Sequence, residues 1–285
     1  MGSKDNGVTS GGKLGRQDFL KLAGGAAAWV ASAGLLTSCG EETAGEKPEG
    51  EVGSEASKGR LLARPAASPS DATVPTGLQP LGIGPERDGL VYVPPSYDAS
   101  RPAPLTLMLH GAGGNARGGI SPFLGLADEA GLVLLAPESR RRTWDVLVGG
   151  YGPDVEFIDR ALEQTFESLA VDARNLGIAG FSDGASYALS LGLTNGDLFG
   201  HVIAFSPGFS SPAERRGKPP VFVSHGTGDE VLPIERTSRR IVPRLERMGY
   251  EVRYREFDGP HTVPEPVARE ALEWATPVRP KPPQA

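Results

Sequence analysis

The chain has 285 residues, and its 35 acidic and 29 basic side chains give a formal net charge of −6. Nucleic-acid binding draws on basic surface, so this balance argues against a DNA or RNA partner. A single cysteine excludes an intrachain disulfide, and together with only four histidines it offers no metal-ligand spacing. We therefore expect no metal and no cofactor.

Residues 1–38 have the layout of a secretory signal. Basic residues precede an uncharged apolar stretch over residues 22–38, which is rich in small residues and short for a permanent membrane span. Removal of residues 1–38 takes away four basic and two acidic side chains, which brings the net charge from −6 to −8. Residues 16–21 resemble a twin-arginine export motif, but Gln17 stands where the second arginine belongs, so the export route stays open.

The signal ends in residues 36–39, which resemble the bacterial lipobox, where cleavage precedes a cysteine that then carries a lipid. Cys39 is the only cysteine of the chain. A lone cysteine at that position favours lipid attachment over a disulfide, and an incidental or buried thiol is the alternative. We expect an exported lipoprotein that Cys39 anchors to the extracytoplasmic side of a membrane.

Composition divides the rest of the chain. From Gly40 to about Thr76 it is rich in Glu, Gly, Ser, Pro and Ala, with almost no large apolar residue before Leu61. Such a segment buries too little surface to offset its ordering entropy. We expect a flexible, lipid-anchored linker over residues 39–76, one folded domain over residues 77–276, and a disordered tail over residues 277–285, which hold four prolines.

Apolar runs alternate with helical stretches in the expected domain. Residues 105–109, 131–137 and 201–205 are typical of buried strands. The periodicity of residues 155–169 places one apolar stripe on a helix, made of Val155, Ile158, Leu162, Phe166 and Leu169. This alternation predicts an α/β domain with a mostly parallel sheet and helices on both faces. No spacing leaves room for a large lid.

The motif G-x-S-x-G spans residues 180–184, between an apolar strand at 175–179 and a helical stretch at 185–193. In that context it predicts a nucleophile elbow, a sharp turn that exposes the Ser182 hydroxyl above the sheet. The glycines are needed where strand and helix pass closest. The alternative is that Ser182 is a buried turn serine.

An acid and a base follow in the chain order expected after such a nucleophile. An apolar strand at 221–224 precedes Asp229 and Glu230, of which we favour Asp229. A last strand at 251–257 alternates with period two and leads into the loop that holds His261, just before a final helix.

A serine hydroxyl needs a base to take its proton as it attacks. The imidazole of His261 suits this task because it titrates near about pH 6.5 when unperturbed, and Asp229 would fix its tautomer. Three other histidines compete. His110 and His225 each end a strand beside a glycine, where they satisfy loop backbone groups, and His201 opens a strand.

Such chemistry also needs donors for the developing oxyanion. The strand at 105–109 ends in a glycine-rich turn over residues 110–114, which frees backbone N–H groups. We expect the oxyanion donors to be the backbone N–H groups of Ala112 and of Asp183, the residue after the proposed nucleophile.

These segments together resemble the α/β-hydrolases, in particular the phospholipase/carboxylesterase-like and dienelactone-hydrolase-like serine esterases. The matching segments are residues 110–113, 180–184, 225–229 and 259–261, and the resemblance covers about residues 80–276. It implies a serine hydrolase that cleaves carboxylic esters without a cofactor. Asp183 departs from the commonest pattern, since many carboxylesterase-type relatives have an amide there.

The resulting expectation is a membrane-anchored serine esterase that acts on small-molecule esters through an acyl-enzyme. One alternative is a hydrolase of polymeric esters or thioesters, which an open cleft would admit. The other is a cell-surface binding lipoprotein that keeps the fold without turnover. The basic run at residues 140–142 is expected on a solvated loop, with a place near the cleft, steering anionic substrates, as its alternative.

Overall fold

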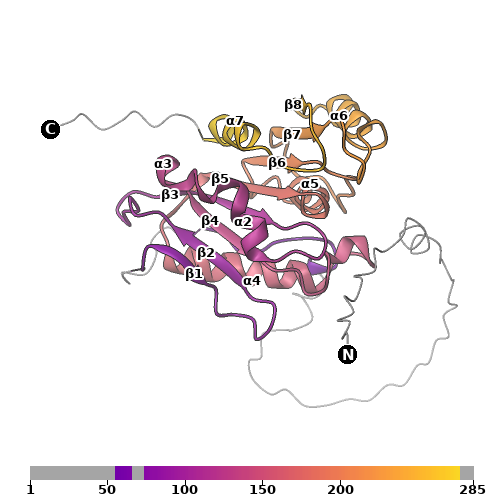
Figure 1. Cartoon of the computed structure of the whole chain (residues 1–285). Helices are drawn as coiled ribbons and strands as arrows, with labels where there is room; N and C mark the ends of the chain where they lie inside the picture. The colour runs from indigo at the N-terminus through magenta and orange to yellow at the C-terminus, as the bar shows by residue number, and fades with distance from the viewer. Residues whose placement is uncertain (1–54, 66–73, 277–285) are drawn as a thin grey trace, which may run out of the picture. The chain divides into compact units, whose positions relative to one another are not determined.

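The computed structural model describes residues 55–65 and 74–276. Eight strands form one sheet in the order β1-β2-β4-β3-β5-β6-β7-β8 (Figure 1). The strands are β1 (Gly77–Pro80), β2 (Gly89–Val93), β3 (Ala103–Leu109), β4 (Val133–Pro137), β5 (Val171–Phe181), β6 (His201–Phe205), β7 (Val221–Gly226) and β8 (Val252–Phe257). The β1–β2 and β2–β4 pairs are antiparallel, and the other neighbouring pairs are parallel.

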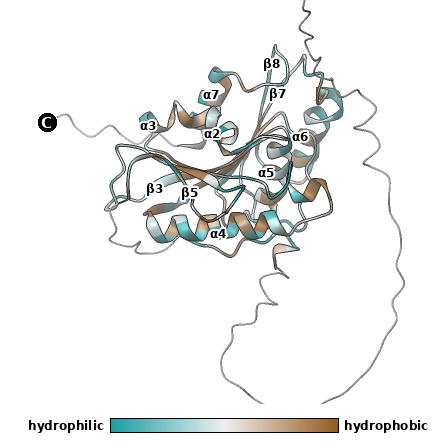
Figure 2. Cartoon of the chain, turned by 60° about the horizontal axis from the view of Figure 1, so that its bottom comes forward, coloured by the Kyte–Doolittle hydropathy of each residue, from teal (hydrophilic) through white to brown (hydrophobic). Residues whose placement is uncertain are grey.

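Helices cover both faces of this sheet. They are α2 (Ala116–Leu124), α3 (Ala127–Ala130), α4 (Pro153–Ser168), α5 (Asp183–Thr194), α6 (Ser238–Arg247) and α7 (Glu265–Ala275), with 3₁₀ turns at Asp145–Leu147 and Ile234–Arg236. One core cluster joins the sheet to α4, α5 and α6, and a second joins its other face to α2 and α7. Figure 2 shows α4 on one side of the sheet and α2 and α7 on the other. The predicted α/β-hydrolase architecture is confirmed, and no lid domain is inserted within residues 74–276.

The predicted apolar stripe of α4 faces the sheet. Pro153 occupies the first turn, where its missing N–H costs nothing, and the helix runs to Ser168. Val155, Ile158 and Leu162 are fully buried, and Figure 2 shows hydrophobic and hydrophilic residues alternating along α4. Each such side chain contributes about 1.5–3 kcal/mol through burial.

The central strands are buried along their length, as expected for a parallel sheet covered on both faces. All residues of β3 and β4 are buried. The carboxyl ends of parallel strands meet at one edge of a sheet, where ligands bind in folds of this class. The loops after β3, β5, β7 and β8 therefore meet at that edge.

Strand β8 closes the sheet on one side and is only half buried. Val252 and Tyr254 face inward to the core, while Arg253 and Arg255 alternate with them in solvent. Arg253 pairs with Glu270 of α7 at 2.8 Å. Charged side chains on an edge strand discourage pairing with a second sheet.

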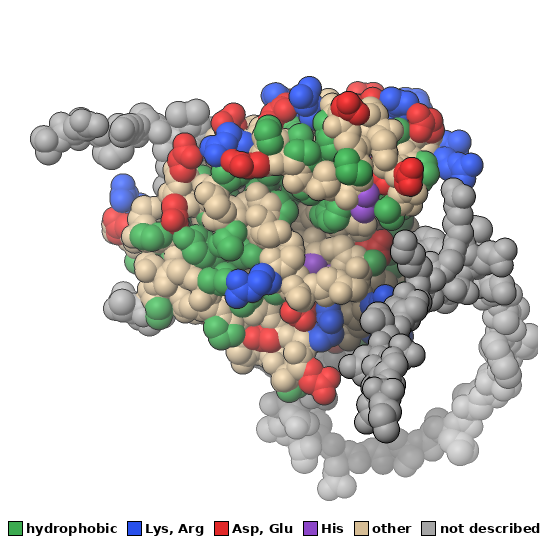
Figure 3. Space-filling model, viewed as in Figure 1, with side chains coloured by type: hydrophobic (Ala, Val, Ile, Leu, Met, Phe, Trp, Pro, Cys, Tyr) green, Lys and Arg blue, Asp and Glu red, His purple; other side chains and the backbone are tan. Residues whose placement is uncertain are grey.

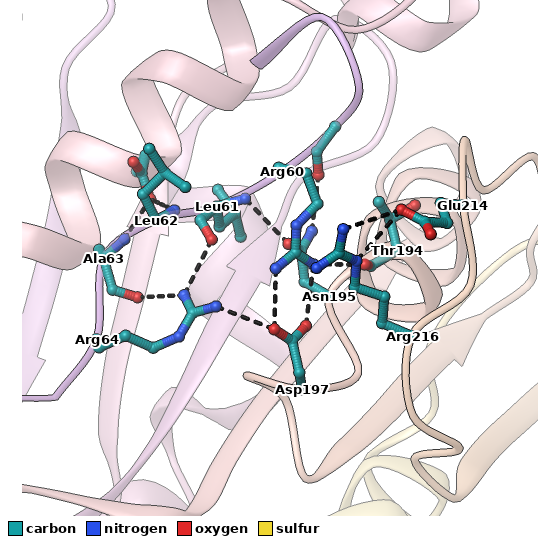
Figure 4. Close-up of polar contacts among 12 residues, drawn as sticks. Arg60, Leu61, Leu62, Ala63, Arg64, Thr194, Asn195, Asp197, Glu214 and Arg216 are labelled. Carbon is teal, nitrogen blue, oxygen red and sulfur yellow. Dashed lines mark hydrogen bonds and ion pairs between the residues drawn. The ribbon is translucent and has the colours of Figure 1, made fainter. Parts of the chain in front are cut away.

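Residues 55–65, here called the N-terminal strap, lie on the domain (Figure 4). Arg60 is buried, and its guanidinium donates to both carboxylate oxygens of Asp197 at 2.9 Å and to the Thr194 carbonyl at 2.8 Å. These partners follow the end of α5, more than 130 residues away in the chain. Arg64 reaches the same carboxylate at 3.1 Å from a more exposed position.

The strap backbone is also paired. Leu61 is fully buried, and its N–H donates to Asn195 Oδ1, whose own amide donates to the Gly59 carbonyl. Asp159 of α4 accepts the next two strap N–H groups at 2.7 and 2.8 Å. The expectation of a flexible linker over residues 39–76 is therefore wrong for residues 55–65, because burial of Arg60 and Leu61 and contacts to α4 and to the end of α5 offset their ordering entropy.

Candidate active site

Ser182 stands at a sharp turn between β5 and α5. Its φ of 58° and ψ of −120° lie in a region that non-glycine residues rarely adopt. The Ser182 N–H donates to the Phe205 carbonyl of β6 at 2.9 Å, which helps to hold this conformation. The glycines on either side allow it. A Cβ on Gly180 would lie 2.2 Å from the Gly184 carbonyl oxygen, and one on Gly184 would lie 2.2 Å from the Leu109 carbonyl oxygen.

His261 lies in the loop after β8 and faces Ser182. Its Nε2 is 2.9 Å from Ser182 Oγ, and its side chain is 13 % exposed. The Phe181 ring packs beside the imidazole, with 4.6 Å between ring centroids. Backbone contacts tie this loop to the one after β7, since the N–H of Gly228 donates to the Gly259 carbonyl at 3.0 Å.

Asp229 lies in that second loop and holds the other side of the imidazole. Its Oδ2 is 2.5 Å from His261 Nδ1, and its Oδ1 accepts the N–H groups of Val231 and Leu232 at 2.9 and 2.8 Å. The adjacent Glu230 is exposed. The structure thus brings together the three residues that the sequence nominated, and it places Asp229 rather than Glu230 against the histidine.

The tautomer of His261 follows from its neighbours. The Asp229 carboxylate only accepts, so Nδ1 carries the proton and donates to it. Nε2 then accepts from the Ser182 hydroxyl. A base, an orienting acid and a hydroxyl in this geometry are what nucleophilic catalysis by serine requires.

The glycine-rich turn after β3 leaves one N–H free next to Ser182. The Gly111 carbonyl accepts the Gly114 N–H at 3.0 Å and lies 2.8 Å from His110 Nδ1, which donates to it. Peptide planarity points the N–H of Ala112 the opposite way. No hydrogen bond within the described part of the chain uses that N–H. A Cβ on Gly111 would lie 3.3 Å from the Ser182 Cβ, so the turn lies against the nucleophile position.

Asp183 opens α5, where the first N–H groups have no intrahelical acceptor. Its carboxylate accepts the Thr143 hydroxyl at 2.7 Å. The Asp183 side chain is therefore fixed by the segment before α4, and its backbone N–H belongs to the positive end of the helix dipole.

Residues 82–220 match the model of a family described as putative esterases. Feruloyl esterase C of Emericella nidulans is 31% identical over 157 residues, which cover 52% of this chain and 57% of that protein. A probable feruloyl esterase C of Aspergillus flavus is 30% identical over 158 residues, which cover 53% and 57%. The chain thus spans little more than half the length of these relatives.

Solved structures share the fold over nearly their whole length. Esterase PE8 superposes with a TM-score of 0.54 and 24% identity, over 65% of this chain and 96% of its own. The fluorophosphonate-binding serine hydrolase F of Staphylococcus aureus gives a TM-score of 0.58 and 15% identity, over 71% and 99%. The chain therefore has the α/β-hydrolase fold.

None of the other three histidines, all of which are described residues, makes a hydrogen bond to Ser182. His110 accepts the Ser139 N–H at 3.0 Å on Nε2, and burial lowers its pKa. His201 lies against Gly177 and the Trp274 ring, and burial lowers its pKa to about 4. His225 contacts the Leu232 carbonyl at 2.8 Å, which satisfies a loop backbone group.

The arginines of the basic run at residues 140–142 lie in different surroundings. The Arg140 guanidinium lies 3.4 Å from the centre of the Phe157 ring and donates to the carbonyls of Arg87 and Glu138, so it is not on a solvated loop. Arg142 is exposed beside the oxyanion turn, where its carbonyl accepts the Gly113 N–H at 2.7 Å. The second part of the run therefore lies beside the glycine-rich turn next to Ser182.

A groove of about 750 Å³ opens next to His261. Its walls are the glycine-rich turn at residues 110–114, α2 and the start of α7, with Phe181 and Val263 among the apolar residues. A larger groove of about 970 Å³ lies at the amino ends of β3 and β5 and contains none of the three triad candidates.

Among residues 55–65 and 74–276, no cluster of His, Cys, Asp and Glu side chains has the arrangement of a metal site, and no helix has the length and apolarity needed to cross a membrane. Cys39, the predicted lipid attachment site, lies outside the described residues.

On the face drawn in Figure 3, side chains of both charge signs are interspersed over α7, β8 and α6.

Proposed function

We propose that this α/β-hydrolase is a serine hydrolase that cleaves carboxylic esters. The observation that carries the proposal is the continuous chain of contacts from Asp229 through His261 to Ser182, at 2.5 and 2.9 Å. The strained backbone at Ser182 supports it, because strain of this kind is kept only where surrounding structure enforces it.

In the proposed reaction, Ser182 Oγ attacks the ester carbonyl while its proton passes to His261 Nε2. The backbone N–H groups of Ala112 and Asp183 donate to the oxyanion, and each such donor lowers the barrier by roughly 3–4 kcal/mol. Collapse of the intermediate releases the alcohol, which takes the proton from His261. Water then attacks the acyl-enzyme by the same steps, and Asp229 stabilises the imidazolium each time.

We further propose that the acyl part is aromatic. Two observations favour it: the named relatives are feruloyl esterases, and the groove beside His261 contains the Phe181 ring and apolar residues on its walls. Aromatic groups gain most from such a surface, since they bury a large area at low entropy cost. Polymeric esters and thioesters are the competing substrate classes.

The amino-terminal segment carries a second proposal, on export and membrane anchoring. We propose that residues 1–38 direct export and that a lipid on Cys39 holds the mature chain at the membrane surface. The support is the charged and apolar layout of this segment and its single cysteine. Radiolabelled palmitate that becomes attached to the parent protein but not to Cys39→Ser would support the anchor.

The test of activity measures kcat/KM for p-nitrophenyl esters of increasing acyl length, for methyl ferulate and for a thioester. Ser182→Ala is the test variant, and Ser100→Ala, an exposed serine far from the triad, is its matched control. We expect turnover by the parent and the control and none by Ser182→Ala. A preference for methyl ferulate over short alkyl esters supports the aromatic acyl group.

A fluorophosphonate probe provides a second readout that needs no substrate. It should label the parent and the Ser100→Ala control at Ser182, and leave Ser182→Ala unlabelled. A parent that neither turns over any ester nor reacts with the probe would refute the proposal and favour a binding protein that keeps only the fold.

A further inference from the structure

A second histidine lies against the carboxylate of Asp229. His225 is the next-to-last residue of β7 and is fully buried. Its Nε2 is 2.8 Å from the Leu232 carbonyl and 3.1 Å from Asp229 Oδ2. Its Nδ1 is 2.7 Å from the hydroxyl of Ser238, the first residue of α6.

These neighbours fix the protonation of the ring. A carbonyl and a carboxylate both accept, so the proton must be on Nε2, where the N–H donates to the Leu232 carbonyl and lies close to the Asp229 carboxylate. Nδ1 then accepts from the Ser238 hydroxyl. Burial lowers the pKa of His225, which keeps this arrangement neutral.

Other charges around the ring are few and compensated. Within the described residues, Glu256 is the register partner of His225 across β7 and β8, and Arg239 of α6 pairs with it through two contacts of 2.7 and 2.8 Å. Asp229 and His261 face the ring from the triad side. The neutral ring therefore acts through its N–H dipole and its contacts.

We infer that His225 is a positioning residue that holds Asp229 for its work on His261. It does so in two ways. Its Nε2 lies 3.1 Å from Oδ2, the oxygen that His261 also uses, and its N–H binds the carbonyl of Leu232, whose own N–H binds Oδ1. The role as an aid to catalysis rests on the proposed function, but the effect on the triad does not.

The sign of the effect on pH dependence follows from the dipole. The positive end of the His225 N–H faces the carboxylate and opposes added positive charge on His261. Loss of this N–H strengthens the attraction between Asp229 and the imidazolium, so protonated His261 becomes more favoured. The acid limb of the kcat/KM profile then moves to higher pH, and looser placement of the carboxylate lowers the plateau.

The first experiment needs no variant. In full-length protein labelled with ¹⁵N at histidine, ring shifts report the tautomer and charge of His225 directly, with only four histidines to assign. We expect a neutral ring protonated on Nε2 throughout pH 5–9. A cationic ring, or a proton on Nδ1, at pH 7 would overturn the inference.

The second experiment compares His225→Leu with His225→Gln, whose amide N–H reaches about as far as Nε2. In His225→Leu we expect the acid limb and the NMR titration midpoint of His261 to rise by about half a unit to one unit, and plateau kcat/KM to fall roughly tenfold. His225→Gln should recover most of both changes. Thermal unfolding shows whether His225→Leu folds. If it does not, Ser238→Ala takes its place, and we expect a smaller rise of the His261 titration midpoint.

Two outcomes separate the inference from the proposed function. If folded His225→Leu keeps the parent's His261 titration, the inference is wrong, whether or not the protein hydrolyses esters. If no ester is hydrolysed and Ser182 does not react with the fluorophosphonate, but the His261 titration shifts as stated, the proposed function fails while the positioning role stands.

Discussion

Replacement of Arg60 by alanine is expected to lower the free energy of unfolding by about 2–3 kcal/mol, although the residue lies in a segment whose composition is that of a linker. Arg60 is 6 % exposed and makes three hydrogen bonds, two of them to the Asp197 carboxylate. Loss of one partner of a fully buried ion pair costs about 3–5 kcal/mol. Asp197 is 39 % exposed, so water rehydrates it and the cost falls below that range.

The assay is urea unfolding at pH 7, with Arg64→Ala as the matched control. Arg64 contacts the same carboxylate oxygen but is 42 % exposed, so its loss should cost no more than about 1 kcal/mol. Equal, small effects of the two substitutions would refute the reasoning, because they would mean that the strap adds nothing to the stability of the domain.

The Arg60–Asp197 ion pair should also make the free energy of unfolding depend on pH. The hydrogen bond from Arg60 lowers the pKa of Asp197 to about 2, below its usual value of 3.8. The ionised carboxylate therefore contributes stability above pH 3.8 that is lost as the pH falls toward 2. The difference between the parent and Arg60→Ala should shrink across that window. A difference that is constant from pH 7 to pH 2 would contradict an ionic origin.

Three further predictions concern the site. Gly184→Ala should prevent folding or greatly lower the melting temperature, since its Cβ would meet a backbone oxygen at 2.2 Å; a normal melting curve would contradict the close approach. Asp229→Asn should lower kcat by about 10⁴-fold through the wrong tautomer, while Glu230→Gln stays near the parent; similar kcat values for both would exclude Asp229 as the triad acid. Arg142→Glu should lower kcat/KM for anionic esters relative to neutral ones, and more at low salt; an unchanged ratio excludes a steering role.

Much of the site was predictable because local chemistry dictates it. The elbow needs glycine at 180 and 184 for steric reasons that no distant contact alters, and the structure shows both close approaches. Asp229, and not Glu230, is the carboxylate beside His261. The shorter side chain accepts the N–H groups two and three residues ahead, which turns the loop around the carboxylate.

The strap and the basic run were not predictable in this way. Composition between residues 39 and 76 hides the strap, because its stability depends on partners more than 130 residues later, and Leu61 after Arg60 was the only local signal. The run at 140–142 looked uniform, yet Arg140 is held by an aromatic ring and by carbonyls that only the folded chain supplies.

The proposed triad is divided between strands, and this division has a consequence for inactivation. Ser182 follows the central strand β5, but His261 depends on β8, which lies at the edge of the sheet and is half exposed. Edge elements open locally at lower free energy than central strands. On gentle heating, local opening of β8 should therefore abolish the proposed esterase activity reversibly, while the circular dichroism of the rest of the molecule stays unchanged.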